Sequence, residues 1–281
     1  MICDSFFHIG VTHEICEDYA LNRDNYAIIS DGCSNGGGPS IDTDWGSRLL
    51  CKAAEQHLAK QYNIPLFCEA VLSTAQTQRS TFPNLTPQCL TATLLTIQKV
   101  NDEILGFMSG DGVIGARKRG TDEWEFTERS FESNAPYYLI YESSEEDRKQ
   151  YLEIFSGESK LTTTVFNMKT GNVSFDSLIV PFDEKNPHFT KSYPIEQYDL
   201  VFIASDGVSS FTELVKTETS KFTNNIDVAS VLNVLFKIPI KRPGFLKIQN
   251  QWAFKTKMKG SFQSLNWQNC DDVAVGAIWN D

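Results

Sequence analysis

The 281-residue chain is 41% hydrophobic and 22% charged, and its formal net charge of -11 at pH 7 disfavours a general affinity for nucleic acids or anionic membranes. A chain of this length can bury roughly three quarters of its unfolded surface, so a sizeable core needs no disulfides. Its seven cysteines form no CxxC pair, its first residues do not resemble a secretory signal, and no apolar run approaches the ~18 residues of a membrane span, so we expect reduced thiols and a cytoplasmic protein.

In chain order, the first half of the sequence predicts strands that lead to acidic residues, with two helices between them. Apolar and β-branched runs predict strands at residues 26–30, 91–98 and 102–109. Asp42 or Thr43 can cap a helix whose apolar residues recur at helical spacing up to Leu58. Pro65 suits the first turn of a second helix, which ends near Arg79.

The second half predicts further strands at about residues 161–180, 200–205 and 273–279. Ser143 or Ser144 precedes three acidic residues that favour a helix start, and Asp227 can cap a helix that continues to Leu235. We find no internal repeat or linker-like tract, which indicates a single domain over residues 1–281. Strands and helices do not alternate regularly, so we expect an antiparallel core with helices packed outside it.

Acidic residues lie at the ends of several predicted strands. The four sites are Glu17-Asp18, Asp31-Gly32, Asp206-Gly207 and Asp271-Asp272. A single Asp-Gly pair is most often a hairpin turn, but strands that lie side by side would bring all four sites to one edge of the sheets. Two carboxylates ~4 Å apart repel each other by about 4 kcal/mol at an effective dielectric constant of 20, and a divalent cation turns that repulsion into attraction.

The donor types at these sites favour hard cations. All-oxygen ligation selects Mg²⁺ or Mn²⁺ rather than zinc, and the histidines show no HxxxH or HExxH spacing. Gly32 has no Cβ, so its carbonyl can turn toward a metal.

The short motifs along the chain, taken together and in order, resemble those of a known family. They are Gly10…His13…Cys-Glu17-Asp18, Ile-Ser-Asp31-Gly32, Asp44-Trp-Gly46-Ser-Arg48-Leu, Thr91-Ala-Thr, Ser-Gly-Asp111-Gly, Ala-Ser-Asp206-Gly207 and Asp271-Asp272. Over residues 8–279 this set resembles the type 2C class of metal-dependent serine/threonine protein phosphatases, above all its bacterial branch. The resemblance implies an α+β fold, a four-layer α-β-β-α sandwich of two antiparallel sheets flanked by helices, with metals in a cleft at one end.

The resemblance also implies a site for two Mg²⁺ or Mn²⁺ ions, with a third and weaker one. The residues in the ligand positions are Glu17, Asp18, Asp31, Gly32, Asp111, Asp206, Asp271 and Asp272. Asp31 would bridge two ions, and Asp206 and Asp271 would complete the shell of one of them. Asp111 would hold the third ion together with Asp206, unless it only forms a tight Gly-Asp-Gly turn.

His13 and Cys33 depart from the family pattern. Many members have a phosphate-binding arginine where this chain has His13, which can donate to a phosphate oxygen when protonated, or which is a plain surface loop residue. Some members have a histidine after the metal-binding Asp-Gly, proposed as the proton donor, where this chain has Cys33. The general acid is therefore open between a metal-bound water and His13. No cysteine-phosphatase loop surrounds Cys33, which argues against a nucleophilic role.

We therefore expect hydrolysis of phosphoserine and phosphothreonine on proteins by a water activated between two metals, with Asp31, Asp206 and His13 as catalytic candidates. The expected partner is a phosphorylated protein, such as the target of a partner kinase. The protein is expected to be a monomer that binds no nucleic acid and no membrane. Two alternatives stay open: a catalytically weak phosphoprotein-binding regulator, and a phosphatase of a small phosphorylated metabolite.

Two regions are candidates for setting specificity. Residues 117–195 match the family pattern least, and the family's flap falls in this stretch, where Tyr137, Tyr138 and Tyr141 either line a peptide groove or pack internally. Residues 237–259 are basic and interleaved with aromatic residues. This segment either docks acidic partners or offsets the charge of an acidic molecule.

Overall fold

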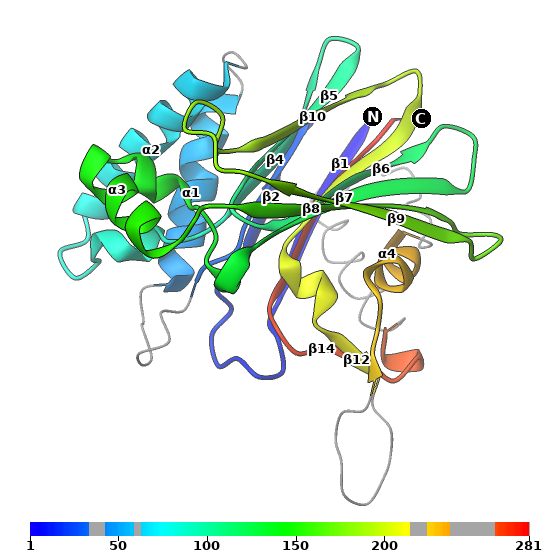
Figure 1. Ribbon diagram of the computed structural model, residues 1–281. Helices are drawn as coiled ribbons and strands as arrows, with labels where there is room; N and C mark the ends of the chain where they lie inside the picture. Colours follow the sequence, from blue (N-terminus) through cyan, green and yellow to red (C-terminus); the bar gives the residue numbers. More distant parts are fainter. Residues whose placement is uncertain (34–42, 59–62, 214–223, 237–261, 281) are drawn as a thin grey trace, which may run out of the picture.

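Two antiparallel β-sheets lie face to face between helices (Figure 1). The computed structural model describes residues 1–33, 43–58, 63–213, 224–236 and 262–280. In these ranges the strand order of the seven-stranded sheet is β1 (Ile2–His8), β15 (Val273–Trp279), β11 (Tyr198–Ala204), β6 (Gly112–Lys118), β7 (Glu123–Phe131), β8 (Ser159–Asn167) and β9 (Val173–Val180). The order of the five-stranded sheet is β10 (Phe189–Pro194), β5 (Glu103–Ser109), β4 (Leu94–Val100), β3 (Tyr26–Ser30) and β2 (Tyr19–Asn22). A small sheet contains β13 (Asn224–Asn225), β12 (Phe211–Glu213) and β14 (Trp267–Asn269).

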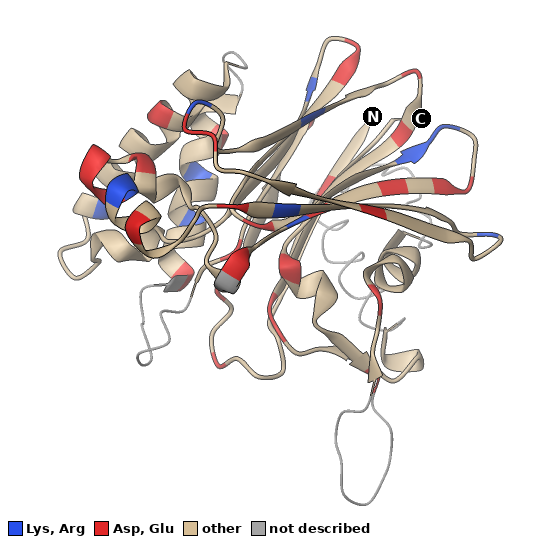
Figure 2. Cartoon of the chain, viewed as in Figure 1, with Lys and Arg blue, Asp and Glu red and all other residues tan. Residues whose placement is uncertain are grey.

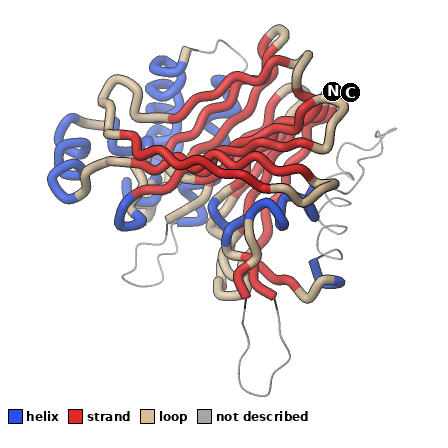
Figure 3. The backbone as a smooth tube through the Cα atoms, turned by 45° about the vertical axis from the view of Figure 1, so that its right-hand side comes forward, coloured by secondary structure: helices blue, strands red, loops and turns tan. Residues whose placement is uncertain are grey.

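Helices cover the outer faces of both sheets, which gives four layers. The helices α1 (Thr43–Leu58) and α2 (Ile64–Ser80) pack on the five-stranded sheet, and α4 (Val228–Phe236) packs on the seven-stranded sheet. Near α2 lie α3 (Glu145–Ile154) and the 3-10 turn η3 (Leu139–Glu142). Figure 3 shows these helices, in blue, outside the red strands. The predicted α-β-β-α sandwich is confirmed.

The longest apolar runs of the sequence form strands that are buried on both faces. In β3, Ile29 points into the core between the sheets, while Ile28 packs against α1 and α2. In β11, Ile203 faces the same central core, and Phe202 packs under α4. Successive side chains of a strand point to opposite faces, so β3 and β11, which are covered on both faces, have apolar residues on both. This explains why uninterrupted apolar runs predicted these strands well.

The predicted helix starts are confirmed by their hydrogen bonds. Asn63 caps α2, with its side chain accepting from the Leu66 N–H, and Pro65 lies in the first turn. Ser144 caps α3, and Asp227 accepts from the backbone of α4. Asp42, one of the two candidate caps of α1, lies outside the described residues. None of the helices in the described ranges has the length and hydropathy that a membrane crossing requires.

Two parts of the strand prediction need correction. The strand predicted at 91–98 begins only at Leu94, because Pro87–Leu90 form a 3-10 turn and Thr93 bonds to Asp31 instead of a neighbouring strand. The strands β1, β2, β6, β7, β10, β12, β13 and β14 were not predicted. In β7 buried apolar side chains alternate with polar ones, and in β10 only Tyr193 is buried, so neither strand is an uninterrupted apolar run.

The two ends of the described chain lie side by side at the end of the sandwich opposite the acidic residues. β1 and β15 pair antiparallel, with Ile2 opposite Trp279 and His8 opposite Val273. Figure 1 marks N and C next to each other. The other end of this strand pair leads directly into residues 9–18 and 270–272, which belong to the candidate site.

Asp4 on β1 is a buried acid away from that site. Burial raises its pKa from 3.8 to about 6, although a hydrogen bond from the Ser5 N–H opposes the shift. Folded Asp4 therefore holds its proton more tightly than the unfolded chain does. The stability this contributes is full below about pH 4 and is lost as the pH rises through about 6.

Asp4→Asn is therefore expected to raise the free energy of unfolding at about pH 7 by up to about 3 kcal/mol, because asparagine has no charge to bury. Near pH 4 the variant and the unchanged protein should differ little. Urea denaturation at both pH values measures this. An equal gain at both pH values would mean that the charge of Asp4 is not the cause.

Candidate active site

The acidic residues predicted at strand ends come from both sheets and meet at one end of the sandwich. Asp31 follows β3, and Asp206 opens the 3-10 turn η4 (Asp206–Ser209) after β11. Asp18 precedes β2, and Asp271 lies shortly before β15. Asp111 lies in the turn where the chain crosses from β5 in one sheet to β6 in the other. Figure 2 shows red acidic segments at the strand ends beside η4.

The crossing at Asp111 depends on its two glycine neighbours. Gly110 has φ of 86° and Gly112 has φ of 131°, which is backbone that side chains with a Cβ rarely adopt. The Gly-Asp-Gly turn therefore does more than close a hairpin. It passes the chain between the two sheets and leaves the Asp111 carboxylate buried beside Asp206.

Asp206 lies at the centre of the acidic cluster. Its negative charge raises the pKa of each of its neighbours, in every case in addition to a larger effect of burial. These neighbours are Asp18, Asp31, Asp111, Glu128 and Asp271. Burial and then Asp206 raise the pKa of Asp111 to about 7. Such a group of acids is stable only when it shares protons or binds cations.

Asp31 and Asp18 form the buried core of this cluster. Burial and the adjacent charges of Asp18 and Asp206 raise the pKa of Asp31 well above its usual range. Asp18 is fully buried, and its Oδ2 accepts a hydrogen bond of 2.8 Å from the Ser205 hydroxyl. Its Oδ1 has no hydrogen-bond donor among the described residues. A buried acceptor beside further acceptors is the environment that a cation would satisfy.

Asp272, which the sequence suggested as a ligand, has different partners. Its Oδ1 accepts from the Gly10 N–H at 2.7 Å, and its Oδ2 accepts from the Glu17 N–H at 2.6 Å. Both oxygens thus hold the backbone of residues 9–18. In our interpretation Asp272 positions this loop, while Asp271 next to it faces Asp206.

His13 lies at the rim of the cluster. Its Nε2 is 3.3 Å from Oδ1 of Asp271, and its Nδ1 is 3.3 Å from Oδ2 of Asp272. Burial lowers its pKa, but the charges of Asp272, Asp271 and Glu17 outweigh burial, so the pKa is raised overall. The ring is 28% exposed, which leaves a cationic group open to an anionic ligand.

Cys33 and Tyr138 lie beside the cluster, close enough to sense the charge of Asp111. The Tyr138 phenol bonds to the Cys33 thiol, and burial raises the pKa of both groups. The charges of Asp111 and Asp31 raise the pKa of Tyr138 further. The thiol therefore stays protonated, in line with the prediction that Cys33 is not a nucleophile. Gly32 is buried, and its backbone pairs with that of Ala92.

Glu128 and Arg129 on β7 also lie near the acidic cluster, but the sequence analysis did not identify them as site residues. The charge of Asp206 contributes to raising the pKa of Glu128, and the charge of Arg129 acts to lower the pKa of Asp111. Arg129 is buried over the Phe131 ring, with its guanidinium carbon 4.7 Å from the ring centroid, and donates to the Pro187 carbonyl at 2.9 Å. The pairing of β6 with β7 brings these residues to the site. The alternation of apolar and polar residues in β7 is the sequence signal that could have predicted this strand.

Comparison with known proteins shows the family and the fold of the chain. Residues 10–241 match the family described as Protein phosphatase 2C. A solved bacterial serine phosphatase has the same fold, with 10% identity, a TM-score of 0.50, and coverage of 100% of this chain and 98% of that chain. The serine/threonine phosphatase PstP/Ppp of Mycobacterium tuberculosis is 14% identical, with a TM-score of 0.48 and coverage of 100% and 99%. No curated protein sequence matches the chain.

Proposed function

Because this chain belongs to the protein phosphatase 2C family, we propose that it hydrolyses phosphoserine and phosphothreonine on proteins with the help of Mg²⁺ or Mn²⁺. The family assignment makes the chain a phosphatase, a hydrolase of phosphoric monoesters. The observation that carries the proposal is the convergence of Asp18, Asp31 and Asp206, which lie within reach of one another although they are far apart in the sequence.

The residues of the cluster fit divalent cations. Their donors are carboxylates and a carbonyl, and the unpartnered Oδ1 of Asp18 lies among them. We assign the cations to Asp31, Asp206, Asp271, Asp18 and the Gly32 carbonyl, with Asp111 as part of a third and weaker site. Bound Mg²⁺ or Mn²⁺ supplies activation of water at neutral pH and neutralisation of phosphate oxygens.

The chain's own residues supply the remaining functions. We propose that the imidazolium of His13, which contacts Asp271 and Asp272, binds the substrate phosphate at the rim of the cluster. It is also the candidate to deliver a proton to the leaving serine or threonine oxygen. Cys33 stays a thiol under Tyr138 and takes no nucleophilic part.

The decisive experiment is a Mn²⁺ titration of the purified protein with p-nitrophenyl phosphate, followed by phosphoserine and phosphothreonine peptides. We expect turnover that rises with Mn²⁺ and is abolished by EDTA. Sugar phosphates in parallel separate a metabolite phosphatase from a protein phosphatase. Binding of phosphopeptides without turnover would instead support a regulator, and turnover that persists in EDTA would contradict the proposal.

The proposal also covers the extent of the domain, the position of the substrate flap and the expected partner. We propose a single phosphatase domain over residues 1–281, with the substrate flap within residues 117–195, which contain η3, α3, β8 and β9. Tyr137 and Tyr138 are buried, so internal packing is the main role of at least these two tyrosines. Residues 237–259 lie outside the described residues, and we keep a phosphorylated protein as the expected partner of a monomer.

A further inference from the structure

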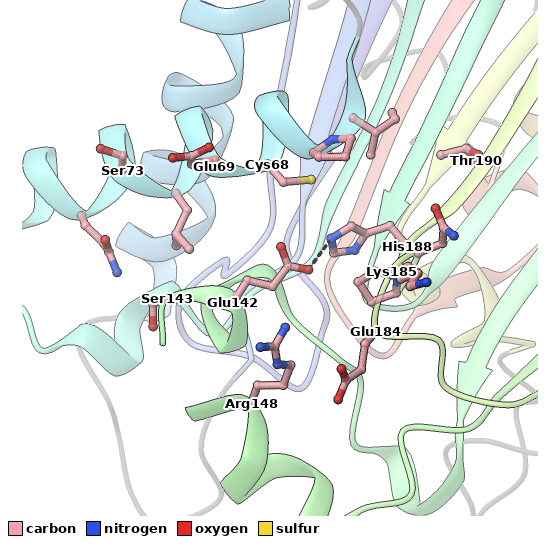
Figure 4. A pocket seen from close by; sticks show the side chains of 16 residues that line it. Cys68, Glu69, Ser73, Glu142, Ser143, Arg148, Glu184, Lys185, His188 and Thr190 are labelled. Atoms are coloured by element: carbon pink, nitrogen blue, oxygen red, sulfur yellow. Dashed lines mark ion pairs between the residues drawn. The ribbon is translucent and has the colours of Figure 1, made fainter. Parts of the chain in front are cut away.

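A second group of chemically active side chains lies in a cavity away from the acidic cluster. The cavity has a volume of about 720 Å³ and opens between α2, η3 and the residues just before β10. The carboxylates of the acidic cluster do not belong to its lining. Figure 4 shows the side chains of Cys68, Glu142 and His188 converging.

Each of the three residues comes from a different part of the fold. Cys68 lies on α2, Glu142 is the last residue of η3, and His188 immediately precedes β10. One donor atom of each lies within 4.8 Å of the other two. The Nε2 atom of His188 is 2.8 Å from Oε1 of Glu142. The sulfur of Cys68 points toward the same ring (Figure 4).

The side chains of Cys68 and His188 are buried, that of Glu142 is partly buried, and the polar atoms of His188 and Glu142 lack ordinary hydrogen bonds. The side chain of His188 is only 4% exposed, and Cys68 is 3% exposed. Despite the short contact, neither ring nitrogen of His188 nor Oε1 of Glu142 makes a hydrogen bond of normal geometry within the described ranges. A buried polar atom without a hydrogen bond costs about 1–3 kcal/mol, and here only the ion pair between Nε2 of His188 and Oε1 of Glu142 offsets that cost, so a bound cation would satisfy these atoms better.

We propose that Cys68, Glu142 and His188 bind a Zn²⁺ ion. A thiolate, an imidazole and a carboxylate are the donors that zinc combines, whereas the oxygen donors of the acidic cluster suit Mg²⁺ or Mn²⁺. Donor atoms around tetrahedral zinc lie about 3–4 Å apart, given bonds of about 2.0–2.3 Å, so small side-chain rotations suffice. Three protein ligands would leave a fourth position for a water or another ligand, and all three residues line the cavity.

Zinc binding requires loss of the Cys68 proton. Burial and then the charge of Glu142 raise the pKa of this thiol, so the metal-free residue is neutral. When the S–Zn bond forms, the S–H bond breaks and the proton passes to solvent, so the sulfur binds as a thiolate. Binding should therefore strengthen as the pH rises.

The proposed ion would connect three separate segments. Glu142 ends η3, and Tyr138, which bonds to Cys33 beside the acidic cluster, immediately precedes the same turn. An ion at Glu142 would thus fix the segment that carries Tyr138 against α2 and β10. The site does not depend on the proposed phosphatase activity, and its test is independent of turnover.

Cobalt(II) is the spectroscopic probe, used on the full chain after its metals are removed by a chelator. We expect a near-ultraviolet thiolate-to-cobalt band that added Zn²⁺ abolishes. Cys68→Ser should remove the band. The matched control is Cys33→Ser, which alters the thiol beside the acidic cluster and should leave the band intact. No thiolate band in the unchanged protein, or a band that survives Cys68→Ser, would overturn the proposal.

Glu142→Gln and His188→Asn provide variants that keep the thiol. Each removes a direct ligand, so Zn²⁺ affinity in competition with a chromophoric chelator should fall by more than the roughly 10- to 100-fold that loss of an outer-shell partner costs. Circular dichroism checks that the variants are folded. Unchanged Zn²⁺ affinity in both folded variants would also reject the site and leave only an ion pair beside a buried thiol.

Discussion

Asp206→Asn is expected to lower Mn²⁺-dependent hydrolysis of p-nitrophenyl phosphate by about 10²- to 10³-fold, which is the scale on which removal of one preorganised electrostatic group acts. Asp206 interacts with Asp18, Asp31 and Asp271 at once, so the loss of its charge weakens every cation position that those residues share. Asparagine keeps the shape of the side chain, and steady-state kinetics across a Mn²⁺ series measures the change. Asp31→Asn should act in the same way.

The same substitution should stabilise the metal-free protein. Without cations the charge of Asp206 repels the neighbouring carboxylates, and asparagine removes this repulsion. Tm should therefore rise by about 2–4 °C for each kcal/mol of stability gained. The control is Asp199→Asn at the other end of β11, where the acid pairs with Arg117 at 2.6 Å and activity should persist. Activity retained in Asp206→Asn, or a metal-free Tm that falls, would contradict the central role of Asp206.

Gly207→Ala is expected to reduce both stability and activity. A Cβ at Gly207 would lie 1.7 Å from the carbonyl oxygen of Asp272, a backbone atom that cannot rotate away. Overpacking of this kind costs about 1–3 kcal/mol or more. The loops that carry Asp206 and Asp271 would have to separate, and a displacement of about 1 Å at a reacting centre can cost about 100-fold in rate.

Thermal unfolding and Mn²⁺-dependent turnover, measured on the same preparation, test this prediction. Ser209→Ala serves as the matched control because Ser209 lies in the same 3-10 turn and is exposed. It loses only a hydrogen bond to the Asp206 carbonyl, so its stability should change by about 1 kcal/mol or less. If Gly207→Ala behaved like this control, the close contact between the two loops would not matter for the site.

The parts of the fold that the sequence predicted are those in which local pattern and tertiary environment agree. Buried strands such as β3 and β15 are continuous apolar runs, and the acids that follow or precede them mark one end of the sandwich. Helix caps such as Ser144 and Asp227 act within a few residues of their own position. These features require no knowledge of distant contacts.

The remaining features depend on contacts between distant segments. Asp271 and Asp272 are adjacent residues of the same type, so the sequence cannot distinguish their roles. In the fold, Asp272 accepts hydrogen bonds from Gly10 and Glu17, whereas Asp271 faces Asp206. Glu128 reaches Asp206 because β7 pairs beside β6.

The same holds for the second group of donors. Cys68, Glu142 and His188 have no common motif, because a helix, a turn and a strand start bring them together. These three residues could be recognised as a group only from the folded structure.

The pairing of β1 with β15 has a practical consequence for handling this protein. Ile2 and Trp279 are neighbours at the end of the sandwich remote from Asp206, whereas His8 and Val273 lie toward it. A fluorescent label, a surface tether or a fused domain attached beside Ile2 or Trp279 would therefore leave the acidic end accessible. A short linker between the two termini would also allow a circularly permuted chain whose new ends are opened in an exposed turn.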